Sequence, residues 1–182
     1  MILDNLLMFD SPLAPRNLAQ VTGTYDSTNI IDLHIINGGL PVLANLQGAR
    51  DIGIGDDPAM KLLVMVTTAF TSGGAGTLIV ELEGATDNGS GAPNAFSVWW
   101  ISPTYALATL ALGARLLDMD FPRPPAGIAI PRFLKLQYVV GGATMTAGQV
   151  IAGIVLDRDD QPYQSTGNAV QGGYPAGITV SN

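Results

Sequence analysis

Residues 132–140 read RFLKLQYVV, and this stretch does most to decide the fold. One set of alternate positions is apolar throughout and comprises Leu134, Leu136, Tyr138 and Val140. The positions between them are mixed and comprise Phe133, Lys135, Gln137 and Val139. Because successive side chains of a strand point to opposite faces, this period of two predicts a β-strand with one buried face and one wet face.

Two further stretches alternate in the same way. In Thr77–Glu83 the buried face would carry Leu78, Val80 and Leu82, and in Arg115–Phe121 it would carry Leu117, Met119 and Phe121. Other expected strands are continuously apolar or lack clear alternation: Asn29–Ile36, Lys61–Val66, Ala95–Ile101 and Val150–Leu156. Their β-branched and aromatic residues and flanking glycines favour strands over short buried helices.

Glycine-rich and proline-rich turns separate these segments at short intervals, at residues 53–58, 72–76, 86–93, 122–127 and 141–148. About eight short strands at such spacing predict an all-β, antiparallel sandwich. Tyr105–Ala114 has high helix propensity and is left open as a further strand or a short helix.

The composition indicates a protein that buries surface against other proteins. Only 13% of the 182 residues are charged, where about 25% is usual, and the net charge is -7. With few charges to solvate a free surface, we expect apolar surface to be covered by another subunit or a partner. The acidic charge and the absence of any Lys/Arg run argue against direct contact with nucleic acid.

The residue types needed for catalysis are scarce. The chain's single His, His34, lies in a predicted strand, and we interpret it as a residue of the wet or interface face rather than as the base of a nucleophilic triad. With no Cys and one His, the chain cannot build an ordinary zinc site. Asp56 and Asp57, and Asp157, Asp159 and Asp160, could offer oxygen ligands to Ca²⁺ but do not match a calcium-loop spacing, so we interpret them as solvated turn acids. We therefore predict no catalytic residue, no cofactor and no metal, and a protein that is not an enzyme.

The two ends differ in composition from the middle. We predict an N-terminal arm over residues 1–28, a sandwich domain over 29–157 and an extended or flexible tail over 158–182. The start lacks the cationic region of a signal peptide, and no run approaches the length of a membrane helix, so we expect no membrane association.

Candidate contact residues come from both ends and from one strand. They are Met1, Ile2, Leu3, Leu6, Leu7 and Phe9 of the arm, Tyr163 and Tyr174 of the tail, and the pair Trp99 and Trp100. Strand alternation would put one Trp in the core and the other outside or at an interface.

Four blocks of the sequence resemble the capsid cement proteins of tailed phages, typified by that of the Bordetella short-tailed phage. The first block lies in residues 1–9 and consists of Met1–Asp4 and Leu7–Phe9. The second is Ala49–Gly55 and the third is Phe70–Leu78. The fourth consists of residues 136–142, 146–148 and 153–157. The chain departs from the family pattern around residues 36–47, 102–113 and 121–131, and after Asp157.

This resemblance implies a jelly-roll subunit that self-associates on the outer surface of an icosahedral phage head. It would clamp neighbouring copies of the major capsid protein and stabilise the shell against the pressure of packaged DNA. A homodimer is favoured and a homotrimer is possible. The implied location is the virion, after synthesis in the host cytoplasm.

A carbohydrate-binding jelly roll of the head-fibre or receptor-binding type is the alternative, and it would need an exposed aromatic such as Trp99 or Trp100. A jelly-roll enzyme of the cupin kind would need several His ligands, which the chain lacks.

Overall fold

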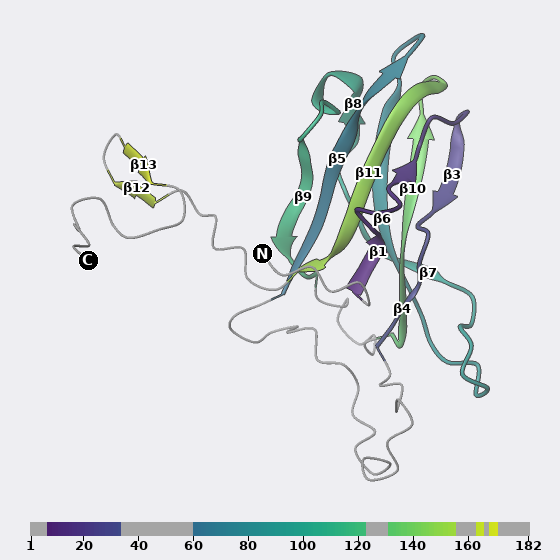
Figure 1. Cartoon of the computed structure of the whole chain (residues 1–182). Coiled ribbons are helices and arrows are strands. Elements are labelled where there is room, and N and C mark those ends of the chain that lie inside the picture. The colour runs from purple at the N-terminus through teal and green to yellow at the C-terminus, as the bar shows by residue number, and fades with distance from the viewer. Residues whose placement is uncertain (1–6, 34–59, 123–130, 156–162, 166–167, 171–182) are drawn as a thin grey trace.

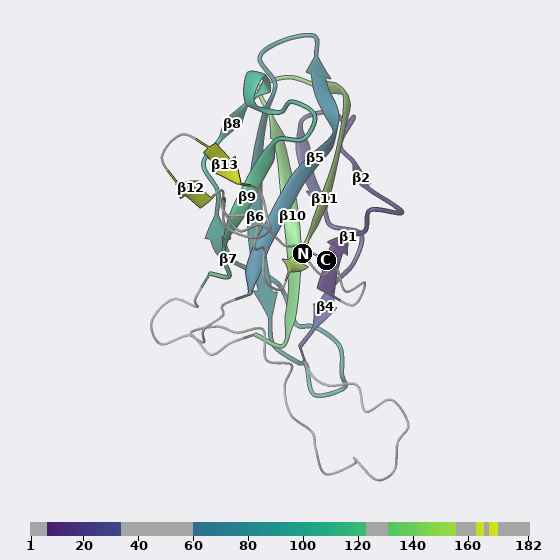
Figure 2. The same ribbon diagram turned by 60° about the vertical axis from the view of Figure 1, so that its left-hand side comes forward.

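The computed structural model describes residues 7–33, 60–122 and 131–155 with their side chains, and the backbone of 163–165 and 168–170. In this part of the chain the secondary structure is almost entirely antiparallel β-strand, which confirms the predicted all-β sandwich. Two sheets face each other across one core (Figures 1 and 2).

Sheet I has the strand order β1-β11-β5-β9, and β2 also pairs with β11. Its strands are β1 (Met8–Asp10), β2 (Arg16–Asn17), β5 (Lys61–Ser72), β9 (Arg115–Asp120) and β11 (Met145–Val155). Sheet II has the order β3-β10-β6-β7, with β4 also paired to β10 and β8 to β6. Its strands are β3 (Gly23–Asp26), β4 (Ile31–Asp32), β6 (Thr77–Ala85), β7 (Ser97–Ile101), β8 (Tyr105–Ala106) and β10 (Phe133–Gly141).

Two tight connections carry the chain from one sheet to the other. β5 of sheet I leads into β6 of sheet II, and β10 of sheet II leads back into β11 of sheet I. β5 pairs with β11 while β6 pairs with β10, so the four strands form one ribbon folded over the core, a feature of jelly rolls. Gly142 turns the second connection with a φ of +71°, and a Cβ there would lie 2.0 Å from the carbonyl oxygen of Ala75.

The alternation that predicted β6 and β10 is confirmed. Every apolar position of the two predicted faces is buried: Leu78, Val80, Leu82, Leu134, Leu136, Tyr138 and Val140. The opposite faces of both strands carry mixed side chains, among them Glu81, Lys135 and Gln137.

Residues 8–26, predicted as part of an extended arm, instead supply three strands of the sandwich. β1 and β2 pair with β11, and β3 pairs with β10. Phe9 and Leu18 are fully buried in the core. These strands are two to four residues long, too short for a sequence period to be recognised.

Tyr105–Ala114 forms neither a long strand nor an α-helix. It contains the two-residue β8 and one 3-10 turn at Leu107–Thr109, and Leu110 after the turn is fully buried. Within the predicted tail, β12 (Tyr163–Ser165) and β13 (Asn168–Val170) pair as a short antiparallel hairpin.

Candidate interaction surface

The predicted contact residues of the N-terminus divide into two groups. Met1, Ile2, Leu3 and Leu6 lie outside the described residues, as does Tyr174, and Tyr163 is described only as a backbone position of β12. Leu7 is half-buried against the core, and Phe9 is fully buried in it. Phe9 therefore acts as a core residue and offers no free contact surface.

Trp99 and Trp100 are both half-buried, and both pack against the core. The prediction that only one of them faces the core is wrong because β7 contains a β-bulge. Val98 is opposite Glu83 of β6 and Trp100 is opposite Leu82, so Trp99 is an extra residue that breaks the alternation. Trp99 packs edge-to-face on Phe121 at a ring-centroid distance of 5.8 Å.

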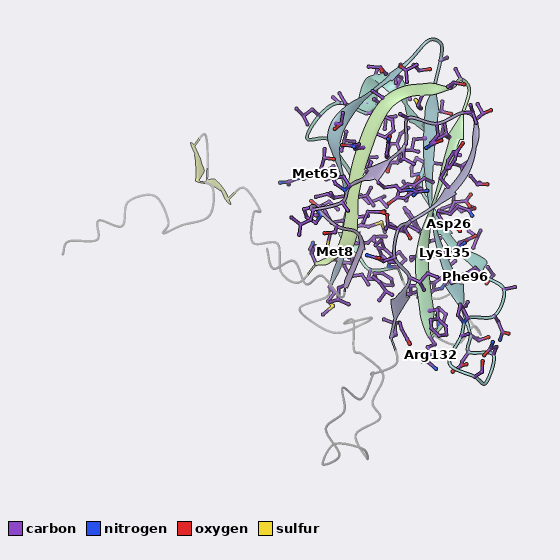
Figure 3. All side chains as sticks on the ribbon, turned by 45° about the vertical axis from the view of Figure 1, so that its right-hand side comes forward. Met8, Asp26, Met65, Phe96, Arg132 and Lys135 are labelled. Carbon is purple, nitrogen blue, oxygen red and sulfur yellow. The ribbon has the colours of Figure 1, made fainter. Side chains whose placement is uncertain are left out.

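The outer face of sheet I carries an apolar cluster that is already covered. Leu62, Val64 and Val66 point into the core, so Leu63 and Met65, which alternate with them, point outward. Met8, Leu63 and Ile151 on this face are nevertheless buried, and Met65 is half-buried. Figure 3 labels Met8 and Met65. A Cβ at Gly153 would lie 2.4 Å from the sulfur of Met8, so this glycine makes room for the Met8 side chain.

The free apolar side chains of sheet II lie on β7. Among the described residues, the large hydrophobic side chains that are exposed are Leu13, Val21, Ile30, Val98, Ile101 and Leu112. Val98 and Ile101 are the two that belong to a strand. Val98 is opposite Glu83 and Ile101 is opposite Glu81, so both lie on the outer face of sheet II.

β7 is also an edge strand without charge. In the described part of the chain it pairs with β6 on one side and with no strand on the other. Charged residues lie on three other edge strands: Arg115, Asp118 and Asp120 on β9, Asp26 on β3 and Arg16 on β2. The two-residue β8, which also pairs with β6, is uncharged like β7, and Asp10 of β1 is fully buried. Charged side chains on an edge strand discourage pairing with another chain, and so does a β-bulge; β7 lacks the charges but contains a bulge.

Beside β7 the outer face of sheet II is fixed by ion pairs. Lys135 of β10 lies 2.9 Å from a carboxylate oxygen of Glu83 and 2.9 Å from one of Asp26, and its ammonium is 4.7 Å from the ring centre of Phe96 (Figure 3). Burial alone would raise the pKa of Asp26, but hydrogen bonds from Gln137 and Lys135 outweigh it and lower that pKa. The lysine thus joins β3, β10 and β6 on one face.

Arg132, just before β10, holds the loop between β6 and β7. Its guanidinium makes two hydrogen bonds of 2.9 Å to Asp32 and another to Asp87. Asp87 also accepts hydrogen bonds from the backbone N–H groups of Gly89 and Gly91, which together with Arg132 lower its pKa. The entry to β7 is therefore held in one position, which limits the freedom of the edge strand itself.

A buried hydrogen bond joins the two sheets on the inside. The Tyr138 hydroxyl donates to Asp10 at 2.6 Å, and the Thr28 backbone N–H donates to the other carboxylate oxygen at 2.8 Å. Both side chains are fully buried. Burial, followed by the charge and hydrogen bond of Asp10, raises the pKa of Tyr138 well above its usual value.

No group of three or more His, Cys, Asp or Glu side chains in the described part of the chain could hold a metal ion, and no described helix could span a membrane. His34 and the acidic residues at 56, 57, 157, 159 and 160 lie outside the described residues.

Sequence reasoning missed the residues that define this surface. Val98 and Ile101 were within a predicted strand, but their exposure depends on the bulge and on the position of β7 at the edge. Arg132 and Asp32 are far apart in sequence, and nothing local to either residue indicates the pairing. The available signal was the absence of charge from SVWWI at 97–101.

Comparison with known proteins gives one family. The family model Bbp16 matches residues 17–154, which extend from the end of β2 to one residue before the end of β11. No curated protein matches the chain.

Proposed function

The chain belongs to the Bbp16 family, a family of Bordetella phage proteins, and from this we propose that it is a cement protein of a phage capsid. It would bind the outer surface of an icosahedral head, self-associate there and clamp neighbouring major capsid proteins. The observation that carries the proposal is the family match over most of the sandwich. The match includes β7, the strand that carries the exposed Val98 and Ile101.

Three physical features support a role in joining surfaces. The sandwich has one core that includes residues from β1 to β11, so it can transmit a load as one body. The outer face of sheet II ends in an uncharged edge strand with exposed apolar side chains. The net charge of -7 disfavours binding to the packaged nucleic acid.

A clamp of this kind resists internal pressure by repetition. Each contact between the protein and two coat subunits needs only an ordinary interface of about 1,000 to 2,000 Å². Many such contacts on one shell act together, and the release of any one copy leaves the others in place.

The carbohydrate-binding alternative is less well supported. It needs an aromatic ring free to stack on a sugar, whereas Trp99 and Trp100 both pack against the core. No aromatic residue is among the exposed large hydrophobic side chains of the described residues.

Binding to shells provides the test. The experiment uses shells assembled from the major capsid protein of the same phage in the absence of this chain. These shells should bind the purified protein until a fixed number of copies per coat subunit is reached, as measured by co-sedimentation. Shells that already carry the wild-type protein serve as the control and should take up no more. Binding that is absent, or that rises without saturation, would contradict the proposal.

A further inference from the structure

We propose that the outer face of sheet II docks a segment of the coat protein that carries a Lys or Arg side chain between apolar residues, and that Glu81 of β6 binds this cation. The proposal rests on the proposed cement function and adds to it the docking surface and the chemistry of the partner. Glu81 is the starting point because, among the carboxylates of the described residues, it is the one with neither a hydrogen bond nor an ion pair.

The other described carboxylates all have partners. Asp10 accepts hydrogen bonds from the Tyr138 hydroxyl and from the Thr28 backbone N–H. The remainder form ion pairs with Lys or Arg side chains: Asp26, Asp32, Glu83, Asp87, Asp118 and Asp120. Gln137 is directly opposite Glu81 on β10, but its amide nitrogen donates to Asp26 at 3.0 Å. In the described sandwich the charge of Glu81 is therefore available to a ligand from outside.

Glu81 lies among apolar side chains on the outer face of sheet II. The side chains of β6 that alternate with it are buried in the core, so Ile79 and Glu81 both point outward. Ile79 is opposite Val139 of β10, and Glu81 is opposite Ile101 of β7. Ile79, Glu81 and Val139 are half-buried, whereas Ile101 and the neighbouring Val98 are 54% and 46% exposed. One unpaired carboxylate thus shares this face with two exposed and two half-buried apolar side chains.

This arrangement determines the chemistry of a partner that covers the face. A partner that buries Val98 and Ile101 also removes water from Glu81, which is opposite Ile101. A carboxylate that loses its water without gaining a counter-charge costs more free energy than the flanking apolar contacts return. The partner must therefore bring a cation. Lys and Arg suit the site because their aliphatic stems pack along apolar side chains while their charged ends reach the carboxylate.

A second copy of this chain is a poor source of that cation. Four of its eight Lys and Arg residues already pair with carboxylates in the described sandwich: Lys61, Arg115, Arg132 and Lys135. The net charge of -7 also makes two copies repel each other. Charge complementarity selects a partner with positive side chains, and in the proposed function that partner is the coat protein.

The outer face of sheet I lacks a comparable site in the described residues. Its apolar cluster is already buried. The charged side chains of β5 and β9 pair with one another, Lys61 with Asp120 and Arg115 with Asp118. A substitution on sheet I is therefore a suitable control for a substitution on the outer face of sheet II.

The test compares Glu81→Gln with Asp120→Asn in binding to coat shells that lack this chain, measured by co-sedimentation. Both substitutions remove one negative charge and keep the shape of the side chain, but Asp120 lies on sheet I with its side chain 74% exposed. Glu81→Gln should raise the dissociation constant at least about tenfold, because the cation of the partner loses its counter-charge. Asp120→Asn should leave it within about twofold of the wild type. Glu81→Lys should abolish binding at the same protein concentrations. Because Glu81 has no partner in the described sandwich, the Tm of Glu81→Gln should stay within about 2 °C of the wild type.

The possible results separate this inference from the proposed function. Equal dissociation constants of Glu81→Gln and Asp120→Asn, with saturable binding of the wild-type protein, would overturn the inference and leave the cement function standing. Sedimentation equilibrium of the free protein tests a second copy as the occupant. Self-association that Glu81→Gln abolishes, with no change in shell binding, would assign the face to that copy and would also overturn the inference. If neither the wild-type protein nor any variant binds shells, the cement function falls and the coat partner falls with it.

Discussion

Replacing Tyr138 by Phe should destabilise the sandwich with almost no change in volume. The substitution removes the hydroxyl that donates to Asp10 at 2.6 Å and leaves that buried carboxyl with the Thr28 N–H, at 2.8 Å, as its remaining hydrogen-bond donor in the described residues. A hydrogen bond to a charged group contributes about 1.5 to 3 kcal/mol, and an under-satisfied buried acceptor is costly, so we expect a loss of about 2 kcal/mol. For a chain of this length that is a fall of about 4 to 8 °C in Tm.

The matched control is Tyr25→Phe. The Tyr25 hydroxyl also donates a hydrogen bond, to the Val21 carbonyl at 2.9 Å, but this bond is solvent-exposed. We expect a change within about 0.5 kcal/mol there. Urea titration followed by Trp fluorescence measures both variants. Equal effects of the two substitutions would refute the reasoning that the Asp10–Tyr138 bond joins the sheets.

The same bond makes a prediction about alkaline pH. Because the pKa of Tyr138 is raised in the folded state, the folded protein favours the neutral phenol, and its contribution is complete below about pH 10. The contribution is lost as the pH rises above that value, since the unfolded chain then ionises first. Tyr138→Phe should therefore flatten the fall in stability between neutral pH and pH 11, and an unchanged slope would contradict this assignment.

Four further predictions concern the ion pairs, a turn and the N-terminus. Lys135→Met should lower the free energy of unfolding by about 2 kcal/mol, because Glu83, whose side chain is 9% exposed, loses its cation. Lys61→Met, which breaks an exposed pair with Asp120, should lower it by at most about 0.5 kcal/mol, as measured by urea unfolding. Comparable losses in the two variants would contradict the argument from burial. Because the pKa of Asp26 is lowered in the folded state, its charged carboxylate stabilises the fold above about pH 4, and this stabilisation is lost as the pH falls through the folded pKa. In Lys135→Met the stability should therefore decline less steeply on acidification than in the wild type. Parallel curves of stability against pH would contradict the pairing of Lys135 with Asp26. Gly142→Ala and Gly89→Ala both place a side chain at positive φ, but only Gly142 faces a close backbone carbonyl. The Tm of Gly142→Ala should therefore fall further than that of Gly89→Ala, by the equivalent of about 1 to 3 kcal/mol. Equal Tm values of the two variants would contradict the clash. A protein without residues 1–6 should remain folded, as measured by circular dichroism. A protein without residues 1–10 also lacks Phe9 and Asp10, so its free energy of unfolding should fall by about 3 kcal/mol or more, the range for Phe→Ala in a core. Equal melting temperatures of the two deletion variants would contradict this prediction.

The long strands could be predicted from the sequence because their hydrophobic period is regular. An apolar side chain stands at every second residue from Leu78 to Leu82 in β6 and from Leu134 to Val140 in β10, and burial follows that pattern. The bulge at Trp99 could not be predicted, since one inserted residue changes the face of its neighbours without changing the composition. β1, β2 and β3 are fixed by pairing with β10 and β11, which lie more than 100 residues further along the chain.

The strand with exposed apolar side chains could be predicted, but its exposed residues could not. From the low charge of the chain we expected surface covered by other proteins, and Trp99 and Trp100 lie in the strand that carries the exposed Val98 and Ile101. The exposed residues of that strand are nevertheless Val98 and Ile101, because the tryptophans turn toward Phe121 and Leu82. Which side chains of an edge strand remain free depends on its neighbours in the sheet, and that information is not local.

The retention of packaged DNA tests the proposed role most directly. Heads of the phage assembled without this protein should release their DNA at a lower temperature than complete heads, as followed by a dye that fluoresces on free DNA. Adding the purified wild-type protein back to such heads should restore the higher release temperature. An unchanged release temperature with every shell site filled would contradict the account.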